Sequence, residues 1–119
     1  MQYMLLIYHE ESALSETEYH ACYEESTRLT HELHSQGKFV SASPLQPAST
    51  ATTVRIRDNR RLITDGPFAE TREQLGGFFM IEAQNLDEAL EIAGLIPAAK
   101  FGVVEVRPVV HLSGLPQLP

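Results

Sequence analysis

Ionisable side chains surround a glycine-proline turn in the middle of the chain, at residues 65–73. Asp65 precedes Gly66-Pro67-Phe68, and a carboxylate that lies against an aromatic ring, partly shielded from water, has a raised proton affinity. Such a carboxylate can act as a general base. An aspartate that begins a turn also commonly accepts backbone hydrogen bonds from residues just ahead of it, which only fixes the loop. The sequence leaves both roles open for Asp65.

Glu105 and Arg107 form a second candidate pair. Their two-residue spacing places both side chains on one face of an extended strand. If that face lines a cleft, Arg107 can anchor a carboxylate or enolate while Glu105 orients it. If it faces outward, the two residues form a surface pair.

The five histidines do not form a familiar metal motif. His31 and His34 are three residues apart rather than the four of the zinc-protease helix, and no third ligand is near. His20 precedes His31 by about 16 Å of helix, so it cannot share their ion. We therefore expect neither a metal nor another cofactor. His9, at the end of the first expected strand, is the histidine best placed to meet the 65–73 loop.

These side chains need elements to position them. The apolar residues 1–8 are typical of a buried strand. Ser15 and Glu18 then form a capping box, which predicts a helix that Gly37 ends. One core-facing stripe is expected on this helix: Tyr19, Cys22, Tyr23, Ser26, Leu29, Thr30 and Leu33.

The second half of the chain predicts strands around one more helix. Residues 52–57 and 61–64 alternate like paired strands, and Asp58-Asn59 between them suit a tight turn. A strand follows at 76–83, then a helix capped by Asn85 with the stripe Leu86, Ala89, Leu90 and Ala93. Residues 103–110 are predicted to form the last strand, and Pro108 suits a sheet edge or a bulge better than a central position.

This order predicts an α+β domain: a ferredoxin-like antiparallel sheet with two helices on one face plus an extra hairpin. In the first strand Met4, Leu6 and Tyr8 point to one face, whereas Tyr3, Leu5 and Ile7 point to the other. Two helices cover only one of these apolar faces. We therefore expect a homodimer in which a second copy covers the other face.

The segment 64–77, from Thr64-Asp65-Gly66 to Gly76-Gly77, resembles the DGPF-domain branch of the YCII-related family. The likeness extends over 1–112 and includes 3–8, 51–55, 86–89 and 104–108. One departure is Asn59, where relatives usually carry glycine. The resemblance implies a dimeric α+β barrel, in which two sheets enclose a cleft. It also implies an enzyme with a histidine and aspartate pair in looser relatives, and an association with extracytoplasmic-function sigma factors in this branch.

Composition and charge limit the possible partners and the cellular location of the protein. The net charge of −7 disfavours nucleic acid and anionic lipid as partners, and the opening apolar run is too short to span a membrane. The single cysteine, Cys22, has no partner within the chain and is interpreted as a core residue in a cytoplasmic protein. We expect one domain over 1–112 and an extended tail over 113–119.

These observations favour a small-molecule site in the dimer cleft, with proton transfer or elimination on a small oxo or hydroxy compound as the reaction. The alternative is a non-catalytic binding or regulatory module. Asp65 and Arg107 are the candidate catalytic residues, and the candidate ligand-binding residues are His9, Phe68, Glu70, Glu73 and Glu105.

Overall fold

The computed structural model describes residues 1–116 of the 119-residue chain. The expected tail 113–119 therefore lies partly outside the described residues. The helices are α1 (Glu16–Ser35) and α2 (Leu86–Leu95), with short 3-10 turns η1 (Ala48–Thr50) and η2 (Pro97–Lys100). The strands are β1 (Gln2–His9), β2 (Phe39–Pro44), β3 (Thr52–Arg57), β4 (Arg60–Asp65), β5 (Gln74–Glu82) and β6 (Val103–Pro108).

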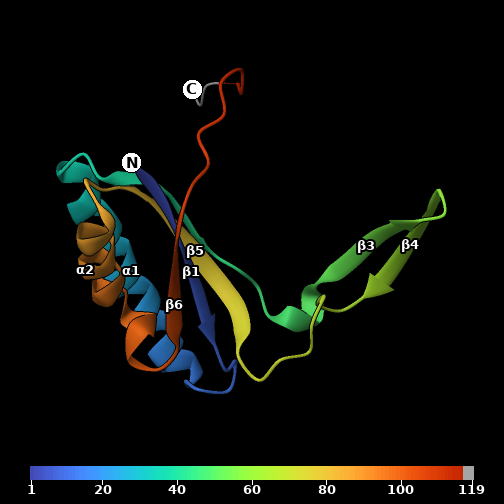
Figure 1. Cartoon of the computed structure of the whole chain (residues 1–119). Coiled ribbons are helices and arrows are strands. Elements are labelled where there is room, and N and C mark those ends of the chain that lie inside the picture. Colours follow the sequence, from blue (N-terminus) through green and yellow to red (C-terminus); the bar gives the residue numbers. More distant parts are fainter. Residues whose placement is uncertain (117–119) are drawn as a thin grey trace.

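Four strands form one antiparallel sheet in the order β2-β5-β1-β6, and both helices lie on the same face of it (Figure 1). This confirms the expected ferredoxin-like α+β fold. β6 is an edge strand, which agrees with its proline, because an edge leaves one side of the backbone free of ladder hydrogen bonds. No helix among the described residues has the length and apolar character needed to cross a membrane.

The helix ends follow the local sequence. The Ser15 hydroxyl accepts a hydrogen bond from the Glu18 amide at 3.2 Å, and the Glu18 carboxylate accepts one from the Ser15 amide at 2.9 Å. This reciprocal capping box begins α1. Gly37 has a φ of +72° directly after the helix, and its amide donates to the His34 carbonyl at 3.0 Å. The left-handed conformation of this glycine ends the helix as predicted.

The core lies between the helices and the sheet. Tyr3 and Leu5 of β1 pack with the buried residues of β5, Phe79 and Ile81. The predicted stripe of α2 is wrong in part, because Leu86 and Leu90 are about half exposed. The buried positions of this segment follow an i, i+3, i+4, i+7 pattern instead: Ala89, Ile92, Ala93 and Ile96.

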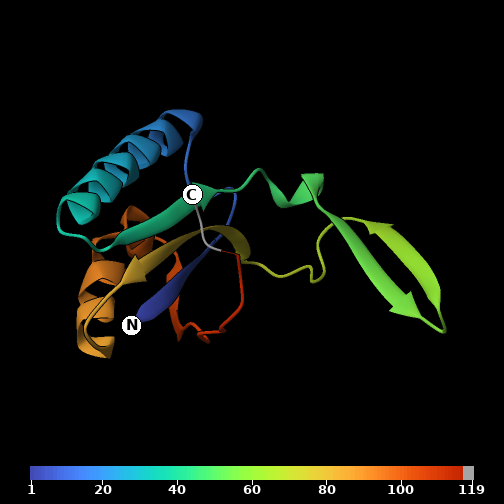
Figure 2. The ribbon, with the colours of Figure 1, turned by 90° about the horizontal axis from the view of Figure 1, so that it is seen from above.

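The hairpin β3–β4 is a separate two-stranded sheet. Asp58 and Asn59 form its turn with φ angles of 51° and 61°, as the sequence predicts. Among the described elements, these strands contact extensively only each other. Figures 1 and 2 show the hairpin extending from the body on the side of the sheet opposite the helices.

Candidate functional site

His9 ends β1, and its side chain continues the alternation of Tyr3, Leu5 and Ile7 toward the helices. The centroid of the imidazole lies 5.8 Å from the centroid of the Tyr19 ring of α1 and 5.6 Å from that of the Phe101 ring. The backbone of His9 pairs with Gln74, next to the 65–73 loop. The ring itself therefore faces the helix layer rather than that loop, which corrects the expected placement.

Hydrogen bonds around His9 define its tautomer. The Glu10 carbonyl lies 3.1 Å from Nδ1 and can only accept, so Nδ1 must carry the hydrogen. The Tyr19 hydroxyl donates to the Glu11 carbonyl at 2.6 Å, which leaves its oxygen free to accept from Nδ1 at 3.4 Å. A neutral imidazole with hydrogen on Nδ1 has an unprotonated Nε2. The lone pair of the neutral His9 ring is then on Nε2.

A cavity of about 280 Å³ lies between α1 and the sheet, and the His9 ring forms part of its wall. The first half of α1 contributes to the cavity wall several side chains that the sequence predicted to lie in the core. Of that predicted stripe only Leu29 and Leu33 are buried, whereas Tyr19, Cys22 and Ser26 line the cavity. The aromatic side chains that line the cavity from the helix side of the sheet are Tyr19, Tyr23, Phe39, Phe79 and Phe101. Ser26, Thr27 and Thr30 supply hydroxyl groups.

Two glycines make room for His9. A Cβ on Gly76 would lie 2.9 Å from the His9 Cδ2 atom and closer still to Nε2. A Cβ on Gly102 would lie 2.8 Å from the His9 Cβ and would also meet the backbone oxygen of Tyr8. Any larger residue at either position must displace the histidine or the strand that carries it. The sequence predicted Gly76 as the first residue of a strand and did not indicate its contact with His9.

Two titratable groups on the α1 wall have shifted pKa values. Burial, followed by the nearby Tyr23, raises the pKa of the Tyr19 phenol, so Tyr19 stays a protonated donor. Burial also raises the pKa of the Cys22 thiol, with Glu25 adding to the effect. A thiol held protonated is a poor nucleophile. Cys22 is nevertheless half-buried at the cavity wall, so its predicted place in the core is wrong.

The 65–73 loop is held mainly by residues other than Asp65. The Thr53 hydroxyl donates to the Gly66 carbonyl at 2.8 Å, and the Gly66 amide donates to the Ala51 carbonyl at 2.8 Å. Within the described residues the exposed Asp65 carboxylate accepts no hydrogen bond. The loop-fixing role that the sequence allowed for Asp65 thus belongs to Thr53 and Ala51 in this structure.

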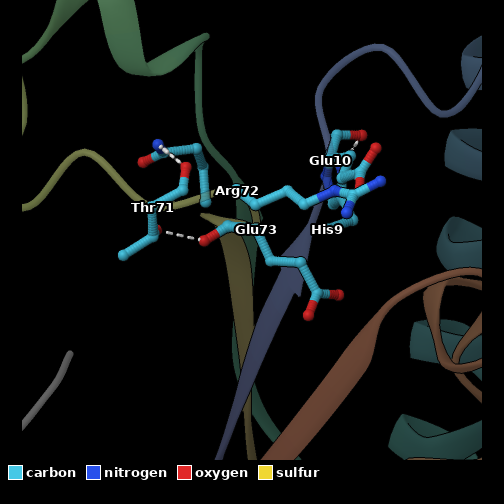
Figure 3. A network of polar contacts seen from close by, with 6 residues as sticks. His9, Glu10, Thr71, Arg72 and Glu73 are labelled. Atoms are coloured by element: carbon cyan, nitrogen blue, oxygen red, sulfur yellow. Dashed lines mark hydrogen bonds and ion pairs between the residues drawn. The ribbon is translucent and has the colours of Figure 1, made fainter.

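Arg72 joins this loop to the end of β1 by an ion pair with Glu10 (Figure 3). The Thr71 hydroxyl donates to the Glu73 carbonyl, while the Glu73 side chain extends away from the Arg72–Glu10 pair. Glu70 and Glu73 are exposed. Phe68 is 79% exposed, and its ring lies 5.5 Å below the Arg55 guanidinium of the hairpin.

Glu105 and Arg107 lie on the face of the sheet that the helices leave open, opposite Leu6 and Met4 of β1. The Tyr8 hydroxyl approaches the Glu105 carboxylate at 3.5 Å. The structure therefore distributes the predicted site residues over three places: the hairpin base, the open face and the helix side. It does not bring Asp65 to Arg107, because β4 packs extensively only on β3. No group of three or more potential metal ligands occurs within the described residues.

Comparison with known proteins gives the family. The model of the YCII-related domain matches residues 1–113. The chain belongs to the YCII-related family. An uncharacterised protein of Rhizobium meliloti is 38% identical to this YCII-related chain over 117 residues, or 91% of each protein.

A solved structure of similar fold is 5-chloro-2-hydroxyhydroquinone dehydrochlorinase from Burkholderia phenoliruptrix, in complex with 2,5-dihydroxybenzoquinone. The TM-score is 0.56 at 16% sequence identity, and the match covers 93% of this YCII-related chain and 95% of the other. The similarity supports the shared α+β fold.

Proposed function

We propose that this protein binds a small molecule in the cavity beside His9 and that His9 Nε2 acts as a general base. The observation that carries the proposal is the 3.1 Å contact between His9 Nδ1 and the Glu10 carbonyl, in a histidine that lines the cavity. A carbonyl only accepts, so Nδ1 donates and the lone pair of the neutral ring is on Nε2. Histidine is the side chain most often used for proton transfer near neutral pH.

The reaction class is proton transfer or elimination on a small oxo or hydroxy compound. Nε2 takes a proton from a carbon or hydroxyl group activated by a carbonyl of the substrate. The electron pair left behind either forms an enolate or expels a leaving group from the adjacent carbon. The positive charge that the imidazole gains is stabilised by the Glu10 carbonyl and the Tyr19 oxygen, both close to Nδ1.

The size and lining of the cavity favour a single-ring ligand. About 280 Å³ is near the lower end of the roughly 300–1,000 Å³ typical of ligand pockets. Phe39 and Phe101 offer apolar surfaces. The Thr27 and Thr30 hydroxyls donate to the Tyr23 and Thr27 carbonyls at 2.8 and 2.6 Å, so their oxygens can accept a hydrogen bond from a substrate hydroxyl. The dehydrochlorinase of similar fold carries out an elimination and was solved with a hydroxylated quinone, which supports the same substrate class here.

The experiment compares His9→Gln with the exposed control His31→Gln on a panel of hydroxyquinones, chlorinated hydroquinones and small keto acids. Loss of a general base typically lowers turnover by about 10²–10⁴-fold. We expect that loss for His9→Gln and none for His31→Gln. Asp65→Asn and Arg107→Gln test the earlier prediction that these residues are catalytic. Full activity of His9→Gln, with Asp65→Asn inactive, would overturn the role of His9.

A further inference from the structure

A β-bulge in β5 lies opposite the end of β1. The register of the two strands shifts by one residue at Gly76, so that Gln74 pairs with His9. In an unbroken ladder Gln74 would pair with Glu10 instead, and Arg72 would lie one position farther from His9. Bulges often occur next to functional sites, where they re-aim a strand. This bulge draws the charged end of the central motif toward His9.

Glu10 contacts both Arg72 and His9. Its carboxylate forms an ion pair with Arg72 Nε, and its backbone carbonyl lies 3.1 Å from His9 Nδ1 (Figure 3). Glu10 follows the last residue of β1, so no strand pairing holds it. The same carbonyl accepts a hydrogen bond from the Ala13 amide at 3.0 Å, within the turn that follows. The position of Glu10 therefore depends on this turn and on the ion pair.

The ion pair connects two segments that are far apart in the chain. Its arginine is exposed, whereas the glutamate is half-buried. An exposed ion pair contributes little to the stability of the whole fold. Its local effect is different, because it restrains the residue whose carbonyl orients the histidine.

We propose that Arg72 is a positioning residue for His9 and acts through Glu10. The guanidinium holds the Glu10 carboxylate, and Glu10 in turn keeps its carbonyl against Nδ1, which fixes the ring and its tautomer. Arg72 does not itself line the cavity. The inference rests on the proposed function, in which His9 is the base.

The kinetic test compares Arg72→Gln with Lys38→Gln. The control removes the Lys38–Glu88 ion pair, which lies at the other end of the sheet. On the hydroxyquinone or hydroquinone that the wild type turns over best, Arg72→Gln should lower kcat about fivefold. That factor corresponds to roughly 1 kcal/mol, the upper end of what an exposed ion pair contributes. KM should not change, Arg72→Lys should recover most of the loss, and Lys38→Gln should match the wild type.

Salt and a double variant test whether the two charges act as one unit. In 1 M NaCl, where the Debye length is about 3 Å, the kcat of the wild type should fall to that of Arg72→Gln, whose own kcat should not respond. The variant that combines Glu10→Gln with Arg72→Gln should be no slower than Arg72→Gln alone. Additive losses would contradict the proposal.

Long-range proton–nitrogen NMR of His9 gives a readout that needs no substrate. The ring-nitrogen signals of His9 should change in Arg72→Gln and keep their wild-type positions in Lys38→Gln. Unchanged signals in Arg72→Gln would overturn the inference even if that variant were slower, because its loss would not pass through the histidine. Full activity of His9→Gln would instead overturn the proposed function, and the spectra would still decide whether Arg72 positions the ring.

Discussion

Gly76 and His9 are packed so closely that a single added methyl group at position 76 would meet the imidazole ring. Gly76→Ala should therefore move Nε2, and a displacement of about 1 Å can cost on the order of 10²-fold in rate. The histidine side chain can rotate away, so stability should change less than activity. Turnover and melting temperature measured together test this. Unchanged turnover would show that the contact does not position the ring.

Gly94 is the matched control for Gly76, because at position 94 an added methyl group contacts no neighbouring atom. It lies near the end of α2, and a Cβ there would meet nothing within 4 Å. Gly94→Ala should raise stability by up to about 0.5–1 kcal/mol, because alanine restricts the unfolded chain and favours helix. Chemical denaturation measures the change, and activity should be unaffected.

The Tyr19 hydroxyl should matter in a pH-dependent way. Its pKa is raised in the folded state, so the protonated phenol contributes stability below the ordinary tyrosine value of about 10, and that contribution is lost as pH rises through the raised pKa. The stability difference between wild type and Tyr19→Phe should be constant near neutral pH and shrink in strong alkali. A difference that grows with alkali would contradict the direction of the shift.

The capping box gives the opposite pH dependence. Hydrogen bonds from the Ser15 backbone and hydroxyl lower the pKa of Glu18, so its carboxylate stabilises α1 above the ordinary glutamate value of about 4.3. This stability is lost as pH falls through the lowered pKa. Glu18→Ala should therefore differ in stability from the wild type at neutral pH and converge with it in acid, as chemical denaturation over a pH series measures.

The sequence predicted the local features of the fold well. The turn at Asp58-Asn59 and the cap at Ser15 depend on contacts between residues close in the chain, and both are confirmed. Alternation in β1 also indicates that His9 points to the same side as Ile7, which agrees with the position of its ring beside Tyr19.

Other features depend on distances between elements, which periodicity does not give. The repeat in α1 shows which side faces the sheet, yet it cannot show that Cys22 and Ser26 line a cavity while Leu29 is buried. Nor could the motif around Asp65 indicate that Thr53 holds its loop, because that hydroxyl comes from the facing strand of the hairpin.

The most direct test of the central claim is the tautomer of His9, measured without any substrate. Long-range proton–nitrogen NMR of the wild-type protein at pH 8, where an ordinary histidine is neutral, distinguishes the protonated ring nitrogen from the free one. His9→Gln assigns the signal by its disappearance. We expect hydrogen on Nδ1 and a free Nε2, as the Glu10 carbonyl requires. Hydrogen on Nε2 would contradict the account, because the nitrogen proposed as base would then have no lone pair to accept a proton.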